Sequence, residues 1–178
     1  GDMLGERGLW YKMNFFEHSA RVPLIMAGPG ISHGTAPNAC SLVDILPTML
    51  DIAGSTGASM PEIGMPVDGR SLMPLARGED DPVDEAIGEY CAEMAGHPVF
   101  MIRRGDYKYI ACDGDTPLLY NLATDPDERT NLVGDPDHKA VAEAFAAEVA
   151  ERWDSETLRK DVMATQRQRR AIHAAMEA

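Results

Sequence analysis

The sequence predicts an α/β fold in which a small antiparallel sheet is packed by a C-terminal helix. Three observations carry this prediction. A nearly continuous apolar run over residues 21–27 is typical of a strand buried on both faces. Four short segments of β-type sequence follow between residues 85 and 122. After residue 135, apolar side chains recur every four positions, which indicates a helix with one buried face.

The first half of the chain is predicted to contain one strand and one helix. Residues 1–19 include three glycines and several charges, so they are expected to form a loop. The strand over 21–27 ends at a Gly-Pro-Gly breaker. Residues 41–53 have apolar side chains at helical spacing, and Pro47 is expected to kink this helix or divide it in two. The stretch 54–83 is rich in Gly, Pro, Ser and Met and predicts an irregular connection.

The second half is predicted to form the sheet and the helix that covers it. Strands are expected over about 85–92, 99–104, 107–112 and 118–122. The stretch Arg104-Gly105-Asp106 is expected to be the hairpin turn between the second and third of them.

A helix is expected to begin at Asp135, a residue type that caps helices well, with Pro136 in the first helical position. Its apolar stripe consists of Val141, Phe145, Val149 and Trp153. A break near Asp154 should separate it from a second helix that runs toward the C-terminus.

Composition excludes several classes of function. With 178 residues and a net charge of −13, the surface would repel nucleic-acid phosphates, so no nucleic-acid partner is expected. The three cysteines, Cys40, Cys91 and Cys112, show no CxxC spacing, which favours free thiols over a disulfide framework or a zinc site. No apolar run reaches the roughly 18 residues that a membrane span needs, so no membrane partner is expected.

One lysine near the N-terminus stands among aromatic residues. Lys12 is preceded by Trp10 and Tyr11 and followed by Phe15 and Phe16, so this stretch holds four of the 11 aromatic residues. A lysine is a point charge on a long stem that can neutralise an anionic oxygen. On residue types alone, a surface lysine beside rings that cover the core is the favoured explanation of the pattern.

Three blocks of sequence resemble the type I sulfatases of the alkaline-phosphatase superfamily, and bacterial choline sulfatases in particular. The first is GDMLGERGLWYK with Phe16-Glu17 and RVPLI at 21–25, the second is SLVDILPT at 41–48, and the third runs from DYKYI at 106–110 through LYNL to DPDE and Asn131-Leu132. They occur in the family's order over residues 1–132. The resemblance implies a sulfuric ester hydrolase, of which this chain is the C-terminal portion.

The resemblance also implies what this chain lacks. In the family, a cation-binding aspartate–histidine or aspartate–asparagine pair stands immediately before the glycine that corresponds to Gly1. The nucleophile motif, Cys-x-Pro-Ser-Arg, lies far upstream, and none of the three cysteines here fits it. A divalent cation (Ca²⁺ or Mg²⁺) and a formylglycine are therefore expected in the full-length enzyme, with no metal ligand in this chain, which alone should be inactive. Residues 1–84 would end the catalytic domain, and residues 85–178 would form a small C-terminal subdomain.

Lys12 matches the family lysine that contacts sulfate and is the expected catalytic residue. Glu17 has either a structural role or a substrate contact. His18 either packs or acts near the leaving group. Trp10 and Phe16 either pack under the loop or bind the quaternary ammonium of choline-O-sulfate, because aromatic faces attract such cations.

Two other functions remain open at this point. One is a phosphodiesterase or phosphonate monoester hydrolase of the same superfamily, and the other is a non-catalytic binding or assembly module. The resemblance further implies a bacterial cytoplasmic protein that forms a homo-oligomer and acts on a small-molecule sulfate ester.

Overall fold

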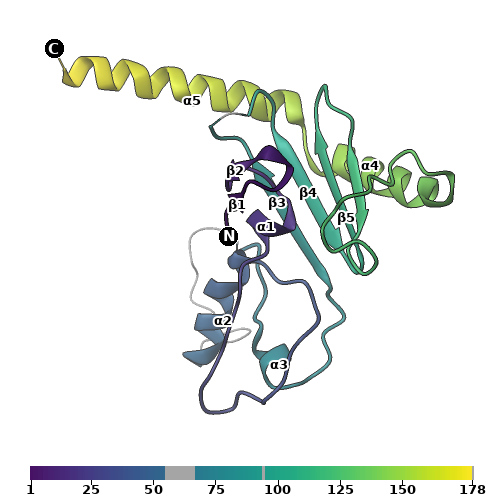
Figure 1. Ribbon diagram of the computed structural model, residues 1–178. Helices are drawn as coiled ribbons and strands as arrows, with labels where there is room; N and C mark the ends of the chain where they lie inside the picture. The colour runs from purple at the N-terminus through teal and green to yellow at the C-terminus, as the bar shows by residue number, and fades with distance from the viewer. Residues whose placement is uncertain (55–66, 94, 178) are drawn as a thin grey trace. The chain divides into compact units, whose positions relative to one another are not determined.

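The computed structural model describes residues 1–54, 67–93 and 95–177 (Figure 1). The chain divides into two compact units. The sheet unit comprises residues 1–22, 88–102 and 106–178, and the connecting unit comprises residues 23–87 and 103–105. The predicted domain boundary between residues 84 and 85 stays a prediction. Within the described ranges, no helix is long and apolar enough to cross a membrane.

A four-stranded sheet is built from four consecutive segments of the chain. Its strands lie in the order β3 (Glu85–Tyr90), β4 (Val99–Arg104), β5 (Tyr107–Cys112) and β6 (Leu118–Asn121). The β5–β6 pair is antiparallel, with Lys108 opposite Tyr120. Gly105, with φ of 54°, makes the turn between β4 and β5. The predicted small sheet is confirmed, with β3 ending two residues before the predicted limit and β6 one residue before it.

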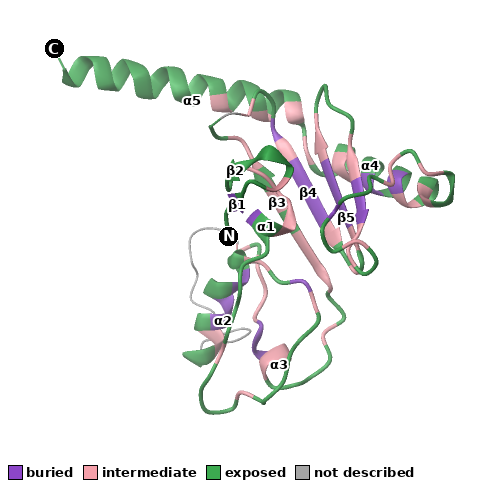
Figure 2. Cartoon of the chain, in the orientation of Figure 1, coloured by how far each residue is buried: buried purple, intermediate pink, exposed green. Residues whose placement is uncertain are grey.

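The core of the sheet unit lies between the sheet and α4 (Lys139–Arg152). Figure 2 shows buried residues along β4 and β5 and in α4. The core cluster consists of Ile102, Tyr109, Leu119, Ala142 and Phe145. Val141, Val149 and Trp153 pack against this cluster, which confirms the predicted apolar stripe of the helix. The rings of Tyr109 and Phe145 stack with centroids 5.8 Å apart.

Aspartate caps begin both C-terminal helical segments. Asp135 accepts a hydrogen bond of 3.0 Å from the backbone N–H of Asp137, at the start of η4 (Pro136–His138), which leads directly into α4. Asp154 accepts one of 3.0 Å from the N–H of Thr157, at the start of α5 (Ser155–Met176). The predicted break between the two helices is confirmed.

The cap of α5 should be sensitive to acid. Hydrogen bonds from Thr157, first from its backbone N–H, hold the pKa of Asp154 below its usual value. A lowered folded-state pKa means that the cap contributes stability above the ordinary aspartate pKa of about 3.9 and loses it as pH falls through the folded value. In Asp154→Ala, we expect faster amide exchange at Thr157 near neutral pH and a shrinking difference from wild type in acid.

Asp154→Asn is the matched control, because asparagine caps helices without titrating. Its amide protection at Thr157 should stay close to the wild-type value near neutral pH and should not fall in acid. Equal exchange rates in the alanine variant and in wild type near neutral pH would contradict the capping role.

The N-terminal segment of the sheet unit was predicted to be a loop and contains four short elements: β1 (Met3–Leu4), η1 (Glu6–Gly8), β2 (Trp10–Tyr11) and α1 (Glu17–Ala20). β1 and β2 pair antiparallel, with Met3 opposite Tyr11. Met3 is buried, so the hairpin is fixed to the body of the unit from one side.

The connecting unit contains η2 (Leu42–Asp44), α2 (Ile45–Ile52) and α3 (Met73–Ala76). The predicted helical region over 41–53 is confirmed. The region is divided into two short helices, as expected, but the boundary lies between Asp44 and Ile45 and not at Pro47, which lies in the first turn of α2, where its missing N–H leaves no helical hydrogen bond unmade.

Buried Asp44 and the partly exposed Arg70 join distant parts of the connecting unit. The Asp44 carboxylate accepts hydrogen bonds from the backbone N–H groups of Ser41 (2.8 Å) and Arg70 (3.0 Å). The Arg70 guanidinium donates to Asp81 at 3.0 Å and to the carbonyl oxygen of Ala39 at 3.2 Å. Hydrogen bonds from the N–H of Val83 and from Arg70 lower the pKa of Asp81.

The strand predicted over 21–27 is not formed. These residues belong to no helix or strand, and Leu24 and Ile25 are 41% and 87% exposed. A strand requires a neighbour that completes its hydrogen bonds, and the sheets of the described residues contain only β1–β2 and β3–β6. Apolar composition alone therefore gave the wrong secondary structure for this chain.

Candidate functional site

Lys12 lies at an exposed turn directly after β2. Tyr11, the residue before it, has φ of 72°, a left-handed backbone conformation that is uncommon for a bulky side chain. Such conformations persist only where the surroundings impose them. Here the pairing of Tyr11 with buried Met3 holds the backbone on one side of Lys12.

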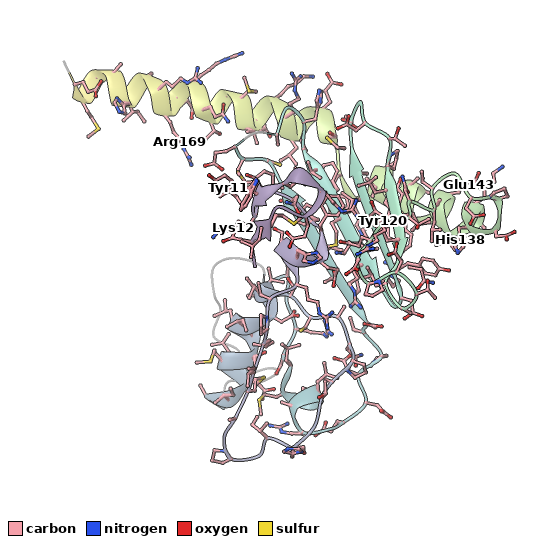
Figure 3. The ribbon with its side chains drawn as sticks, viewed as in Figure 1. Tyr11, Lys12, Tyr120, His138, Glu143 and Arg169 are labelled. Atoms are coloured by element: carbon pink, nitrogen blue, oxygen red, sulfur yellow. The ribbon has the colours of Figure 1, made fainter. Side chains whose placement is uncertain are left out.

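The ammonium group of Lys12 is available to a ligand. Its side chain is exposed and, within the part of the chain that the structure describes, makes no hydrogen bond or ion pair. Figure 3 shows Tyr11 and Lys12 together at one edge of the N-terminal segment. A lysine ammonium carries three N–H donors and a full positive charge, which suits an anionic oxygen cluster.

The segment Asn14–Ala20 follows Lys12 and is closed by its own hydrogen bonds. The side-chain oxygen of Asn14 accepts from the N–H of Phe16 at 3.0 Å, and the hydroxyl of Ser19 donates to the carbonyl oxygen of Asn14 at 3.2 Å. The N–H groups of Ser19 and Ala20 both donate to the carbonyl oxygen of Phe16, at 2.9 and 2.8 Å. The backbone after Lys12 is therefore a defined turn.

A buried ion cluster joins this turn to the sheet. The ammonium of Lys108, on β5, donates to the carbonyl oxygen of Phe15 at 2.8 Å and to Glu128 Oε1 at 2.9 Å, and it is ion-paired with Glu17. The other oxygen of Glu128 accepts from the backbone N–H of Glu17 at 2.7 Å. The side chains of Lys108 and Glu128 are 1% and 0% exposed. We refer to Lys108, Glu128 and Glu17 as the buried ion cluster.

The backbone of Glu128 is itself constrained. Its φ is 55°, and its N–H donates to the carbonyl oxygen of Asp125 at 3.0 Å. The Asp125 carboxylate accepts from the N–H of Thr130 at 2.8 Å, and the backbone N–H groups of Arg129 and Thr130 hold the pKa of Asp125 below its usual value. This turn fixes the direction in which the Glu128 carboxylate enters the protein.

Phe15 provides a third contact between the turn and the sheet. A Cβ atom placed on Gly88, in β3, would lie 2.6 Å from Cε1 of the Phe15 ring. Real Cβ atoms do not approach other atoms so closely, so the ring occupies space that only a glycine leaves open.

We expect Gly88→Ala to destabilise the protein by about 1–3 kcal/mol, because the added methyl group must displace the ring of Phe15. Urea denaturation measures this change in the free energy of unfolding. Gly96→Ala is the control, since a Cβ there meets nothing within 4 Å. If both variants have the same stability, the contact between Phe15 and Gly88 does not hold the turn.

Phe16 is already engaged by a cation of the same chain. The guanidinium carbon of Arg7 lies 4.2 Å from the centroid of the Phe16 ring and 5.6 Å from that of Tyr120. The Phe16 and Tyr120 rings are 6.3 Å apart, and burial raises the pKa of Tyr120. One face of Phe16 is therefore covered, whereas Trp10 is 62% exposed.

The residues that were predicted to bind substrate differ in their exposure to solvent. Lys12, Trp10 and His18 are exposed, whereas Glu17 and Phe16 are partly buried in contacts with other parts of the chain. The carboxylate of Glu6, near His18, has its pKa lowered chiefly by a hydrogen bond of 2.6 Å from the N–H of Leu4. The substrate roles of these residues stay predictions.

Sequence reasoning assigned no role to Lys108, Glu128 or Arg7. Lys108 and Glu128 lie inside the third block that carried the family resemblance, as the lysine of DYKYI and the glutamate of DPDE. Lys108 lies on the face of β5 opposite to Tyr107 and Tyr109, which pack toward α4, so the alternation of the strand could not have marked it and its place in the block was the available signal.

No metal centre is assembled by the residues at 1–54, 67–93 and 95–177: they contain no group of three or more His, Cys, Asp or Glu side chains that could hold an ion. These residues therefore do not by themselves fit the divalent cation that the family resemblance implies.

Comparisons with known proteins place this geometry among sulfatases. Residues 5–155 match the family model for "N-sulphoglucosamine sulphohydrolase, C-terminal". The choline-sulfatase of Rhizobium meliloti (strain 1021) is 42% identical over 179 residues, which cover 99% of this chain and 34% of that protein. Arylsulfatase K of Rattus norvegicus is 40% identical over 147 residues, which cover 74% of this chain and 24% of that protein.

A solved structure gives the same result. A protein of Bacteroides thetaiotaomicron VPI-5482 assigned as a sulfatase superposes with a TM-score of 0.70 and 30% identity, over 93% of this chain and 36% of the other. The chain thus spans about a third of the length of the choline-sulfatase that it matches.

Proposed function

Since this chain belongs to the N-sulphoglucosamine sulphohydrolase C-terminal family, a family of sulfatase domains, we propose that it is the C-terminal part of an enzyme that hydrolyses a sulfate monoester to an alcohol and sulfate. The observation that carries the proposal is the 42% identity with a choline-sulfatase across 99% of the chain, which includes the turn around Lys12. The substrate class that this relative's name suggests is choline-O-sulfate.

Lys12 has the chemistry that the proposed reaction needs. Breaking the ester bond leaves negative charge on the non-bridging and leaving oxygens of the sulfate group, and a fixed cation stabilises that charge. Lys12 presents an exposed ammonium on a backbone held from both sides, by β2 and by the turn Asn14–Ala20. We assign it the sulfate contact.

A divalent cation, Ca²⁺ or Mg²⁺, and a formylglycine nucleophile belong to the proposed whole enzyme. The described residues provide no ligand cluster for the cation, so other residues of that enzyme would hold it. None of Cys40, Cys91 and Cys112 fits the nucleophile motif, so the formylglycine would also come from another part of that enzyme. The role of Lys12 follows from its own charge and position.

Of the two aromatic residues predicted to bind substrate, Trp10 is the better placed for a quaternary ammonium, because it is 62% exposed whereas Arg7 covers Phe16. In the whole enzyme, we expect Trp10→Ala to raise KM for choline-O-sulfate by about 2- to 30-fold, the equivalent of one lost cation–π contact. The KM for p-nitrophenyl sulfate, which has no cation, should change little. An equal change in both KM values would remove Trp10 from the ammonium site.

The proposed function is tested by assaying the whole enzyme with choline-O-sulfate, p-nitrophenyl sulfate and a phosphonate monoester. We expect sulfate release to have the highest kcat/KM. Preference for the phosphonate would contradict the proposal in favour of the related hydrolases. No turnover of any ester would favour a binding or assembly module.

We further propose that the enzyme is a homo-oligomer in which α5 contacts another subunit. From residue 163 to the end of this helix every side chain is exposed, including Met163, Ile172 and Met176. The helix holds five basic and two acidic residues, in a chain of net charge −13, so its charge is complementary to that of a second copy. Light scattering on the whole enzyme, with and without residues 163–178, tests this assembly. An unchanged mass after truncation would contradict it.

A further inference from the structure

We propose that Lys108 and Glu128 are positioning residues for the sulfate contact: they fix the turn Asn14–Ala20 and thereby the placement of Lys12. This inference rests on the proposed sulfatase activity. The side chains of both residues are almost completely buried, so neither is proposed to contact the substrate.

The hydrogen bonds of the cluster are directed at the backbone of the turn. Two of the groups that Lys108 and Glu128 bind are main-chain groups, the carbonyl oxygen of Phe15 and the N–H of Glu17. The carbonyl oxygen of Phe15 and the carboxylates of Glu128 and Glu17 give the three N–H donors of the Lys108 ammonium three acceptors. A lysine whose donors are all occupied inside the protein holds its partners in one geometry.

The cluster adds to the limited packing of this turn. Lys12 has a defined backbone only because the chain is held before it, by β1–β2, and after it, by the turn. The backbone before Lys12 is held in place by buried Met3, which pairs with Tyr11. The backbone after Lys12 is held in place by the Phe15 ring against Gly88 and by the buried ion cluster. The helix α1 adds little, because it has only four residues and one buried side chain.

Burial makes these bonds strong enough to position a catalytic group. The side chains of Lys108 and Glu128 are almost completely shielded from solvent. In such an environment charge-assisted hydrogen bonds are short and are little weakened by water. Displacing a catalytic group by about 1 Å lowers turnover by up to about 10²-fold. The pair can therefore control turnover without touching substrate.

The test uses the whole enzyme with the double substitution Lys108→Met and Glu128→Leu. Replacing both charges by apolar side chains of similar volume is usually tolerated by the fold, but here it leaves the Phe15 carbonyl and the Glu17 N–H without their partners. Well below the melting temperature, we expect kcat for the sulfate ester to fall at least about 10-fold, with KM changed less than about 3-fold. Amide exchange in a peptide covering residues 13–21 should accelerate about 10-fold or more, while a peptide covering β4 exchanges as in wild type.

Two further variants keep the test decisive. Glu128→Gln preserves the side-chain shape and removes one acceptor, so the same changes are expected at smaller size, even if the double variant does not fold. Lys139→Met with Glu143→Leu removes an exposed pair on α4, 3.7 Å apart, and should alter neither kcat nor the exchange of residues 13–21.

Wild-type kcat in a folded double variant would overturn the inference, and so would unchanged exchange at residues 13–21. Because amide exchange is measured without substrate, it tests whether Lys108 and Glu128 stabilise the turn Asn14–Ala20 even if the wild-type enzyme hydrolyses no sulfate ester. That last result would instead contradict the proposed function.

Discussion

Replacing Lys12 by alanine in the whole enzyme is expected to lower kcat/KM for a sulfate ester by about 10²–10³-fold. This is the typical loss when one fixed group that stabilises transition-state charge is removed. The variant should fold as wild type does, because Lys12 is exposed and makes no ion pair or hydrogen bond within the described ranges. Steady-state kinetics with p-nitrophenyl sulfate and a thermal denaturation curve measure the two effects separately.

The control for this variant is Lys139→Ala, which removes an exposed lysine from α4. Its kcat/KM should match that of wild type. If Lys12→Ala also keeps wild-type turnover, Lys12 does not contact the sulfate group, and the assignment of the N-terminal turn as part of the active site is wrong.

Replacing Lys108 alone by methionine is expected to destabilise the protein by about 3–5 kcal/mol. The substitution leaves Glu128, whose side chain is 0% exposed, buried beside Glu17 without its cation. An unpaired buried charge costs far more than the ion pair contributes when intact, because neither water nor a counter-ion solvates it. Urea denaturation of the whole enzyme measures the loss.

The double variant Lys108→Met with Glu128→Leu should recover part of that stability, because no buried charge is left at position 128, although the Phe15 carbonyl and the Glu17 N–H still lose their partners. The comparison separates two causes of instability. If the single and the double variant are equally destabilised, packing around Lys108 is responsible, and the charge of Glu128 is not.

The elements with strong local patterns were predicted well. The apolar stripe Val141, Phe145, Val149 and Trp153 fixes both the existence of α4 and the face that it buries. The four strands of the sheet follow from their β-type composition and from the turn at Gly105. In each case the information lies within about ten neighbouring residues, the range over which a helix or strand period is expressed.

The failure at residues 21–27 has the opposite cause. The run RVPLIMA contains the composition of a buried strand but not the neighbour that would pair with it. A strand forms only when a second segment pairs with it, so the sequence of one segment alone does not predict strand formation.

By itself, the sequence determined the family, the order of the elements from residue 85 onward and the lysine that is proposed to meet sulfate, because these are carried by residue types in short, contiguous blocks. Only the tertiary structure decided how that lysine is held. Glu128 meets the N–H of a residue 111 positions away, and Lys108 meets the carbonyl oxygen of one 93 positions away. The alternation of side chains along β5 predicts that Lys108 lies on one face of the sheet. Lys108 is buried there only because the N-terminal turn covers that face. Contacts between distant segments depend on how the chain folds back on itself, and no local period records them.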